Sequence, residues 1–139
     1  MKLFDATIST LERALDVRLA RQSVLAGNLA NADTPGYVAR ELDFGAAMDA
    51  ARGAIDTPSA AGAARPGDLP VFAGARSPTS PESFVHADPA AAPGLDGNAV
   101  DLDRTLGAVA ENALQYGAAA KAVSKKLAIL RYVASDGAA

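Results

Sequence analysis

Residues 28–37, which read NLANADTPGY, carry the signals of a sharp turn. Pro35 disfavours helical backbone in the residue before it and suits the first central position of a β-turn. Gly36 can take the positive φ that a type II turn requires at the second central position. Asn31 is able to bond backbone groups freed at a helix end, and Tyr37 provides a flat ring with a polar tip. This stretch therefore predicts the end of one helix and a fixed change of chain direction.

Upstream of this turn, the spacing of apolar residues predicts one long helix over roughly residues 5–31. Its positions alternate in steps of four and three, the spacing of a heptad seam: Phe4, Ile8, Leu11, Leu15, Arg18, Gln22, Leu25 and Leu29. The seam becomes polar at its fifth and sixth positions, while Val17, Leu19 and Val24 beside it remain apolar. This shift predicts that the helix packs against more than one neighbour.

A second helix is predicted over roughly residues 101–134. Asp101 suits the N-cap position, Asp103 complements the positive end of the helix dipole, and Gly137 follows as a stop. The same alternation runs without a polar break through nine positions: Leu102, Leu106, Val109, Ala113, Tyr116, Ala120, Val123, Leu127 and Leu130. If the two helices fold back on each other, these seams cover one face each. Four apolar residues then remain for burial against neighbouring subunits, namely Leu19, Val24, Leu114 and Ile129.

The segment between the helices resists regular structure. Seven of the eight prolines fall between Pro58 and Pro93, mixed with glycine, alanine and serine. The prediction is an all-α fold in which two long terminal amphipathic helices pack as a coiled-coil hairpin around an extended, partly disordered middle. The parts are residues 1–44 (first helix and turn), 45–97 (irregular middle) and 98–139 (second helix), and they form one discontinuous helical domain.

Composition argues against several classes of function. A length of 139 residues is usual for one domain, and an aromatic content of 5% predicts a thin core for an isolated monomer. A net charge of -3 with scattered basic residues offers no surface for a nucleic-acid backbone. The start of the chain lacks the apolar run of a cleavable signal, and charges in the first helix argue against a membrane span.

No group of residues predicts catalysis, a metal site or a cofactor. His86 is the only histidine and lies in the proline-rich middle, and cysteine is absent. The acidic residues from Asp96 to Asp103 have the wrong spacing for a calcium loop, so a turn and a helix cap are the better interpretation. Phosphate-binding loops are also absent from the sequence. The chain is therefore predicted to be a non-enzymatic protein without a small-molecule substrate.

The turn carries a resemblance to a known family. The pattern Asn-x-x-Asn-x-x-Thr-Pro-Gly-Tyr after an amphipathic helix resembles the signature of the flagellar axial proteins of the rod and hook. Residues 39–44 are similar to a run typical of the proximal-rod branch of that family, and so are stretches between residues 96 and 131. The resemblance covers about the first 45 and the last 45 residues. The matching motif residues are Asn28, Asn31, Thr34, Pro35, Gly36, Tyr37, Asp43 and Phe44.

This resemblance implies a structural component of the bacterial flagellar basal body rod, on the periplasmic side of the inner membrane. It further implies self-assembly through the terminal helices, with copies of itself and other rod proteins as partners. Export through the flagellar type III apparatus and contact with the base of the membrane ring are implied as well. Two alternatives stay open, namely another axial protein of the FlgC-like branch, and a cytoplasmic helical adaptor or export chaperone.

Overall fold

The computed structural model describes residues 6–56, 80–88, 91 and 98–135. The elements in chain order are α1 (Ala6–Ala30), β1 (Arg40–Leu42), α2 (Phe44–Asp56), the short 3-10 helix η1 (Pro81–Phe84), β2 (Val85–Ala87) and α3 (Leu102–Ala134). The described part of the chain is thus mostly helical, with three α-helices and one small sheet. None of its helices combines the length and the apolar character needed to cross a bilayer.

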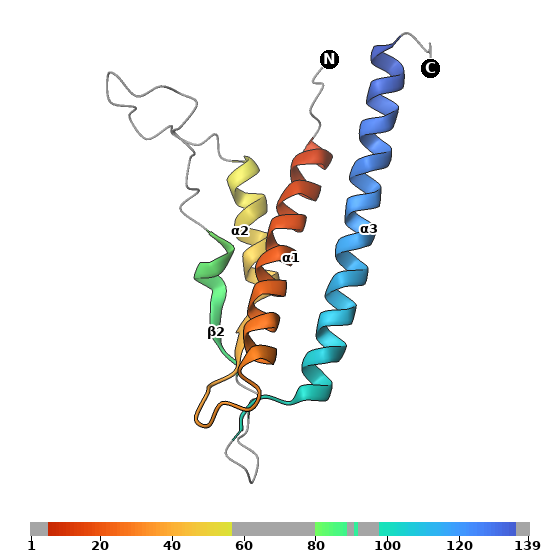
Figure 1. The fold of residues 1–139 in the computed structure, drawn as a ribbon. Helices are drawn as coiled ribbons and strands as arrows, with labels where there is room; N and C mark the ends of the chain where they lie inside the picture. The colour runs from red at the N-terminus through yellow and green to blue at the C-terminus, as the bar shows by residue number, and fades with distance from the viewer. Residues whose placement is uncertain (1–5, 57–79, 89–90, 92–97, 136–139) are drawn as a thin grey trace, which may run out of the picture.

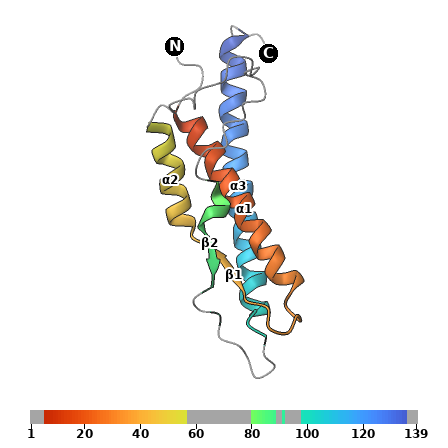
Figure 2. The same ribbon diagram turned by 90° about the vertical axis from the view of Figure 1, so that its left-hand side faces the viewer.

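The other elements are arranged around α1 (Figure 1). Helix α3 runs antiparallel to α1 along one side, while α2 and the strands lie on the other side (Figures 1 and 2). With 33 residues and a rise of about 1.5 Å per residue, α3 is about 50 Å long. Since α1 has 25 residues, α3 is the longer rod of the pair.

A two-stranded antiparallel sheet joins the chain after the turn to the end of the middle segment. Strand β1 pairs with β2 in the register Arg40 with Ala87, Glu41 with His86 and Leu42 with Val85. Two further backbone hydrogen bonds extend the pairing at its ends, Asp43 N–H to Phe84 O (3.1 Å) and Asp88 N–H to Ala39 O (2.8 Å). The sheet therefore holds two segments together that are more than forty positions apart in sequence.

The apolar core lies between α1, α2 and this sheet. Its buried members are Val17, Leu42, Ala47 and Met48, with exposed fractions from 1% to 7%. Half-buried apolar residues surround them: Ala14, Ala20, Val24, Phe44, Phe84 and Val85. The sequence predicts that the first helix packs against more than one neighbour. Besides α3, the second neighbour is α2 together with the sheet. Val24 belongs to this core, which corrects the expectation that it is left for a neighbouring subunit.

The middle of the chain differs from the extended, irregular segment predicted. Helix α2 occupies residues 44–56, and the small sheet corrects the prediction of an all-α fold. Helix α2 is rich in alanine and contains Gly45 and Gly53, so it lacks a strong helical signal of its own. The strands have three residues each, too few for a visible alternation. The disorder predicted for the middle segment falls on residues outside the described ones, namely 57–79, 89–90 and 92–97.

The ends of the two long helices agree closely with the sequence pattern. Helix α1 ends at Ala30, before the turn, and α3 begins at Leu102 after the N-cap Asp101. The Asp101 carboxylate accepts a hydrogen bond from the backbone N–H of Arg104 at 3.0 Å. This satisfies one of the backbone donors that every helix start leaves without a partner inside the helix. The predicted stop at Gly137 lies outside the described residues.

Candidate functional site

Asn28 ties the end of α1 to the strand that follows the turn. Its side chain is 4% exposed. Its Nδ2 donates to the carbonyl oxygen of Arg40 at 2.7 Å, and its Oδ1 accepts from the backbone N–H of Arg40 at 2.9 Å. The Tyr37 hydroxyl donates to the same Oδ1 at 3.1 Å. An amide can be donor and acceptor at once, so the first asparagine of the motif holds β1 against α1 as a second peptide group would.

The remaining motif residues shape the turn itself. Asn31 Nδ2 donates to the backbone carbonyl four residues earlier at 2.8 Å, which satisfies an acceptor in the last turn of α1. The Thr34 hydroxyl donates to Asn31 Oδ1 at 3.4 Å. The backbone N–H of Tyr37 donates to Thr34 O at 3.1 Å, and Gly36 has a φ of 75°. The chain therefore makes the turn that Pro35 and Gly36 predict.

Asp43 and Phe44 start α2 and join it to the core. The Asp43 carboxylate accepts from the backbone N–H of Ala46 at 2.9 Å, the arrangement of an N-cap. The Phe44 side chain packs against the core cluster on one side. On its ring face lies the guanidinium of Arg18, with its central carbon 4.7 Å from the ring centre, a cation–π contact. These two residues thus connect the turn to both α1 and α2.

The middle of the α1–α3 contact is polar. Asn112 of α3 is 1% exposed and donates through Nδ2 to the carbonyl oxygen of Arg18 at 3.0 Å and to Gln22 Oε1 at 2.9 Å. The Arg18 guanidinium donates to Gln115 Oε1, and Gln115 Nε2 donates to Glu111 Oε1 at 2.8 Å. The Oδ1 atom of Asn112 is buried without a hydrogen-bond partner in the described part of the chain.

We infer that this polar layer favours one register of α1 against α3 more than it adds stability. Partial burial and the neighbouring Arg21 lower the pKa of the Arg18 guanidinium, while Glu111 acts in the opposite direction. Buried polar groups cost desolvation energy, but they penalise any other alignment of the two helices strongly. The sequence predicts the α1 side of this layer, because the seam of the first helix becomes polar at Arg18 and Gln22. It does not predict the α3 side, because Asn112 and Gln115 lie one residue before two positions of the second predicted seam.

The predicted seam of the first helix is largely covered. Ile8 is buried, Leu11, Leu15 and Leu25 are half-buried, and Leu29 is 37% exposed. Phe4 lies outside the described residues. Since Arg18 and Gln22 of the same seam bond to Asn112, this face of α1 is directed at α3.

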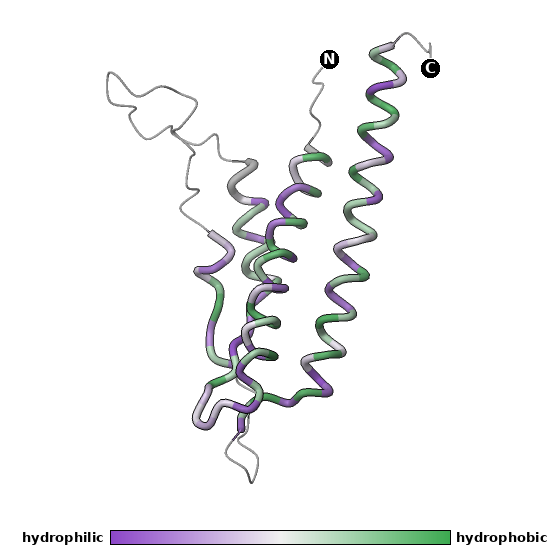
Figure 3. The backbone as a smooth tube through the Cα atoms, in the orientation of Figure 1, coloured by the Kyte–Doolittle hydropathy of each residue, from purple (hydrophilic) through white to green (hydrophobic). Residues whose placement is uncertain are grey.

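The predicted seam of the second helix is only partly covered within one chain. Four of its large side chains stay open to solvent: Leu102 is 49% exposed, Leu106 46%, Tyr116 39% and Leu127 47%. Val109, Val123 and Leu130 are half-buried. The buried residues of α3 are the polar Thr105 and Asn112, so the contact with α1 is rotated away from the apolar seam. Figure 3 shows hydrophobic residues recurring along α3 up to its far end.

Further apolar side chains are exposed outside the seams. Leu19 is 57% exposed, Leu114 75% and Ile129 62%, as the sequence pattern predicts for residues beside the seams. Tyr132 and Val133 near the end of α3 are each 56% exposed. Exposed apolar surface on this scale is characteristic of proteins that bury it against a partner.

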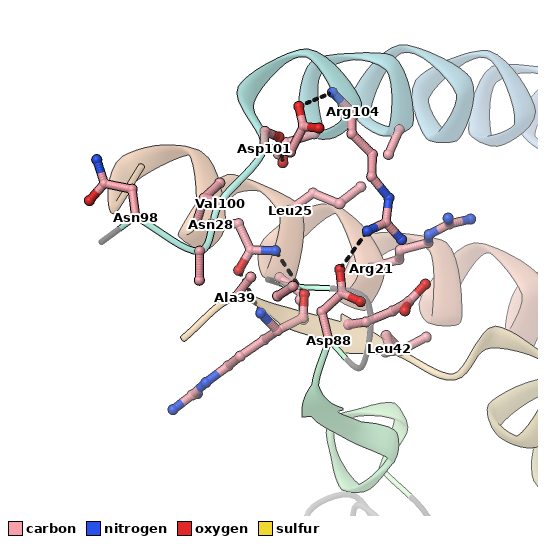
Figure 4. Close-up of a pocket in the computed structure, with 17 residues that line it drawn as sticks. Arg21, Leu25, Asn28, Ala39, Leu42, Asp88, Asn98, Val100, Asp101 and Arg104 are labelled. Atoms are coloured by element: carbon pink, nitrogen blue, oxygen red, sulfur yellow. Dashed lines mark hydrogen bonds and ion pairs between the residues drawn. The ribbon is translucent and has the colours of Figure 1, made fainter. Parts of the chain in front are cut away.

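A cavity of about 520 Å³ lies between the second half of α1, β1 and the start of α3 (Figure 4). Arg104 extends from α3 along the cavity lining and forms an ion pair with Asp88, Nη1 to Oδ2, at 3.0 Å (Figure 4). Asn28 and Arg21 contribute polar groups from α1, and Leu25 contributes an apolar wall. Within the described residues no three acidic or histidine side chains come together to hold a metal ion. His86 is exposed on β2, with its Nδ1 3.2 Å from Phe84 O, and takes no part in this cavity.

Comparison with known proteins identifies the family of the chain. A family model described as flagella basal body rod protein matches residues 8–37, which are most of α1 and the whole turn. The chain is also 36% identical over 135 residues to the flagellar basal body rod protein FlgB of Escherichia coli, with 96% of each protein covered. The chain belongs to the FlgB family. FlgB of Salmonella typhimurium is 38% identical over 114 residues (81% of this chain, 80% of the relative), and FlgB of Cereibacter sphaeroides is 38% identical over 104 residues (75% and 74%).

Membership of the FlgB family confirms that the chain is a structural component of the flagellar basal body rod and not an enzyme. It also confirms the resemblance carried by the turn, and it implies association with other flagellar rod proteins. Because the FlgB relatives are matched over most of their length, the FlgC-like alternative loses its support.

Proposed function

We propose that this chain joins the rod by burying the exposed apolar face of α3 against neighbouring subunits, in a coiled coil built from terminal helices. One observation carries this proposal. The most regular apolar seam in the sequence, from Leu102 to Leu130, is left about half exposed along α3, while polar residues occupy the centre of the contact with α1. A seam of this regularity is typical of helices that pack along their whole length.

The energetics favour ordering that is coupled to assembly. Buried apolar residues are few in the described part of the chain, and two of the six, Ala39 and Ala47, are alanines that contribute little area. At about 25 cal/mol per Å² of apolar surface, so small a core contributes little against the conformational entropy of folding. Burial of the α3 seam between subunits adds the missing apolar area, so the assembled state is the stable one.

The position in the rod and the route to it are part of the same proposal. We infer from the family resemblance that the subunit is exported by the flagellar type III apparatus without cleavage of a signal. Its place is the proximal rod, on the periplasmic side of the inner membrane and next to the base of the membrane ring. A self-associating subunit fits this location, because each copy needs contacts both with its own kind and with the next rod protein.

Far-UV circular dichroism of the purified chain at several concentrations tests the assembly proposal. An assembly subunit is expected to gain helix content and thermal stability as concentration increases, since intersubunit burial supplies much of its stability. A cytoplasmic adaptor or export chaperone is folded on its own. Full helicity and a sharp melting transition that are independent of concentration would contradict the assembly proposal and favour the adaptor.

A further inference from the structure

The face of α1 that is turned to solvent carries a second regular stripe. Its members recur in steps of four and three residues and are all exposed: Glu12, Asp16, Leu19, Ser23 and Ala26. Leu19 is its one large apolar residue and is 57% exposed. The Ser23 hydroxyl donates to the carbonyl oxygen of Leu19 at 3.2 Å and is thus turned back to its own helix. The α1 stripe thus has acidic side chains at one end, an apolar side chain in the middle and small side chains at the other end.

A matching stripe runs along α3, on the side away from α1. It consists of Gly107, Ala110, Leu114, Gly117 and Lys121, all exposed except Gly117, which is half-buried. Leu114 is 75% exposed, the largest exposed fraction among the large apolar residues of the described chain. It is two positions from the buried Asn112, so it points to nearly the opposite side of the helix from the contact with α1. This α3 stripe is small, apolar and then basic.

The two stripes complement each other when they are laid antiparallel. With Leu19 beside Leu114, the four-three steps bring Glu12 beside Lys121. The small residues of each stripe then face small residues of the other, so the helices can approach closely: Ser23 faces Ala110, and Ala26 faces Gly107. Neither Glu12 nor Lys121 forms an ion pair with another described residue of its own chain.

We propose that the α1 stripe of one copy packs antiparallel on the α3 stripe of a second copy. This inference rests on the proposed function and adds a second contact between copies, on a different face of α3 from the seam. The contact is intermolecular because Leu114 lies on the far side of α3 from α1 in the same chain. Copies with a common orientation along an axis meet in this way, since α1 and α3 of each chain are already antiparallel (Figure 1). Two different surfaces meet, so the contact is heterologous and repeats from copy to copy.

Disulfide cross-linking provides the test. The chain has no cysteine, so every disulfide that forms within or between copies must involve the introduced thiols. The full-length variants Leu19→Cys, Leu114→Cys and the double variant are expressed in cells that lack the chromosomal gene, and basal bodies are oxidised and isolated. A disulfide requires Cα atoms within about 7 Å, so it reports on direct contact. Leu102→Cys combined with Leu19→Cys is the control, because Leu102 is also half exposed but lies about 18 Å further along α3.

The expected result is a ladder of dimers and higher species from the Leu19→Cys/Leu114→Cys variant, monomer alone from each single variant, and monomer from the control pair. Dimers from a single variant would show a symmetric contact and overturn the proposal. Monomer alone from the double variant, in basal bodies that contain the chain, would also overturn the proposal but would leave the proposed function standing. Absence of every variant and of the wild-type chain from basal bodies would refute the proposed function itself.

Charge reversal gives an independent readout of the same contact. Glu12→Lys is expected to reduce the swarm diameter at least twofold, since it places Lys121 opposite another cation. Adding Lys121→Glu to that variant restores the opposite signs and is expected to restore swarming. Failure of the second change to rescue the first would contradict the proposed pairing, provided that both variants are present at wild-type levels in the cell.

Discussion

Replacing Leu127 by aspartate is expected to abolish swimming while leaving the amount of the protein in the cell unchanged. Leu127 is 47% exposed in the single chain, so the loss of its buried half costs the free subunit about 1 kcal/mol or less. In the proposed assembly the same side chain is fully buried in a seam between subunits. A carboxylate at that position must either lose its hydration or keep the seam open, and both outcomes prevent incorporation.

The matched control is Ala122→Asp. Ala122 is also exposed on α3 and receives the same charge, but it lies outside both the apolar seam and the proposed α3 stripe. Swimming in soft agar and immunoblots of whole cells measure the two effects separately. Normal swimming of the Leu127→Asp strain would count heavily against burial of the seam, and equal loss in both strains would point to a general effect of negative charge on α3.

Replacing Asn28 by alanine is expected to destabilise the folded chain by about 2–4 kcal/mol. The change removes three hydrogen bonds and leaves the backbone N–H and C=O of Arg40 without the partners they have now. Because β1 is then no longer held against α1, its pairing with β2 and the packing of Leu42 weaken together. Urea unfolding, followed by circular dichroism at one fixed high protein concentration, measures the loss.

Asn31→Ala is the comparison, since Asn31 also belongs to the motif but bonds only within the turn and the last turn of α1. Its expected cost is about 1 kcal/mol. Asn28→Asp adds a second check, because the carboxylate accepts from Arg40 N–H but cannot donate to Arg40 O. It should therefore be at least as damaging as alanine at low salt. Equal, small effects of all three changes would contradict the role given to Asn28.

The sequence predicts the long helices and the turn because each depends on local chemistry. Heptad spacing, the aspartate before α3 and the Thr-Pro-Gly-Tyr turn act over a few residues, so their outcome can be read without the rest of the fold. Helix α2 and the paired strands are different. Helix α2 has five alanines and two glycines among its 13 residues, and each strand has only three residues. These elements form because α1 offers them a surface around Val17. Such tertiary stabilisation leaves little local pattern.

The candidate site shows the same division. The asparagines of the motif can be found from the sequence, but the bond from Asn28 to Arg40 requires the chain to come back twelve residues later. The polar layer between α1 and α3 could be predicted on one side only, from the break at Arg18 and Gln22. Its partner Asn112 lies one residue before a position of the regular apolar seam of α3. That seam predicts a contact face that is rotated by one residue from the observed one. Only the packing of the two helices shows that Asn112 faces α1.

Quantitative mass spectrometry of detergent-extracted, salt-washed flagellar basal bodies from the source cells tests the central claim most directly. The chain is expected to be recovered with the rod in stoichiometric amount and to be retained through the salt wash, because its seam is buried between subunits. Recovery only from the cytosol, with basal bodies that lack the chain, would contradict this claim and favour a helical adaptor.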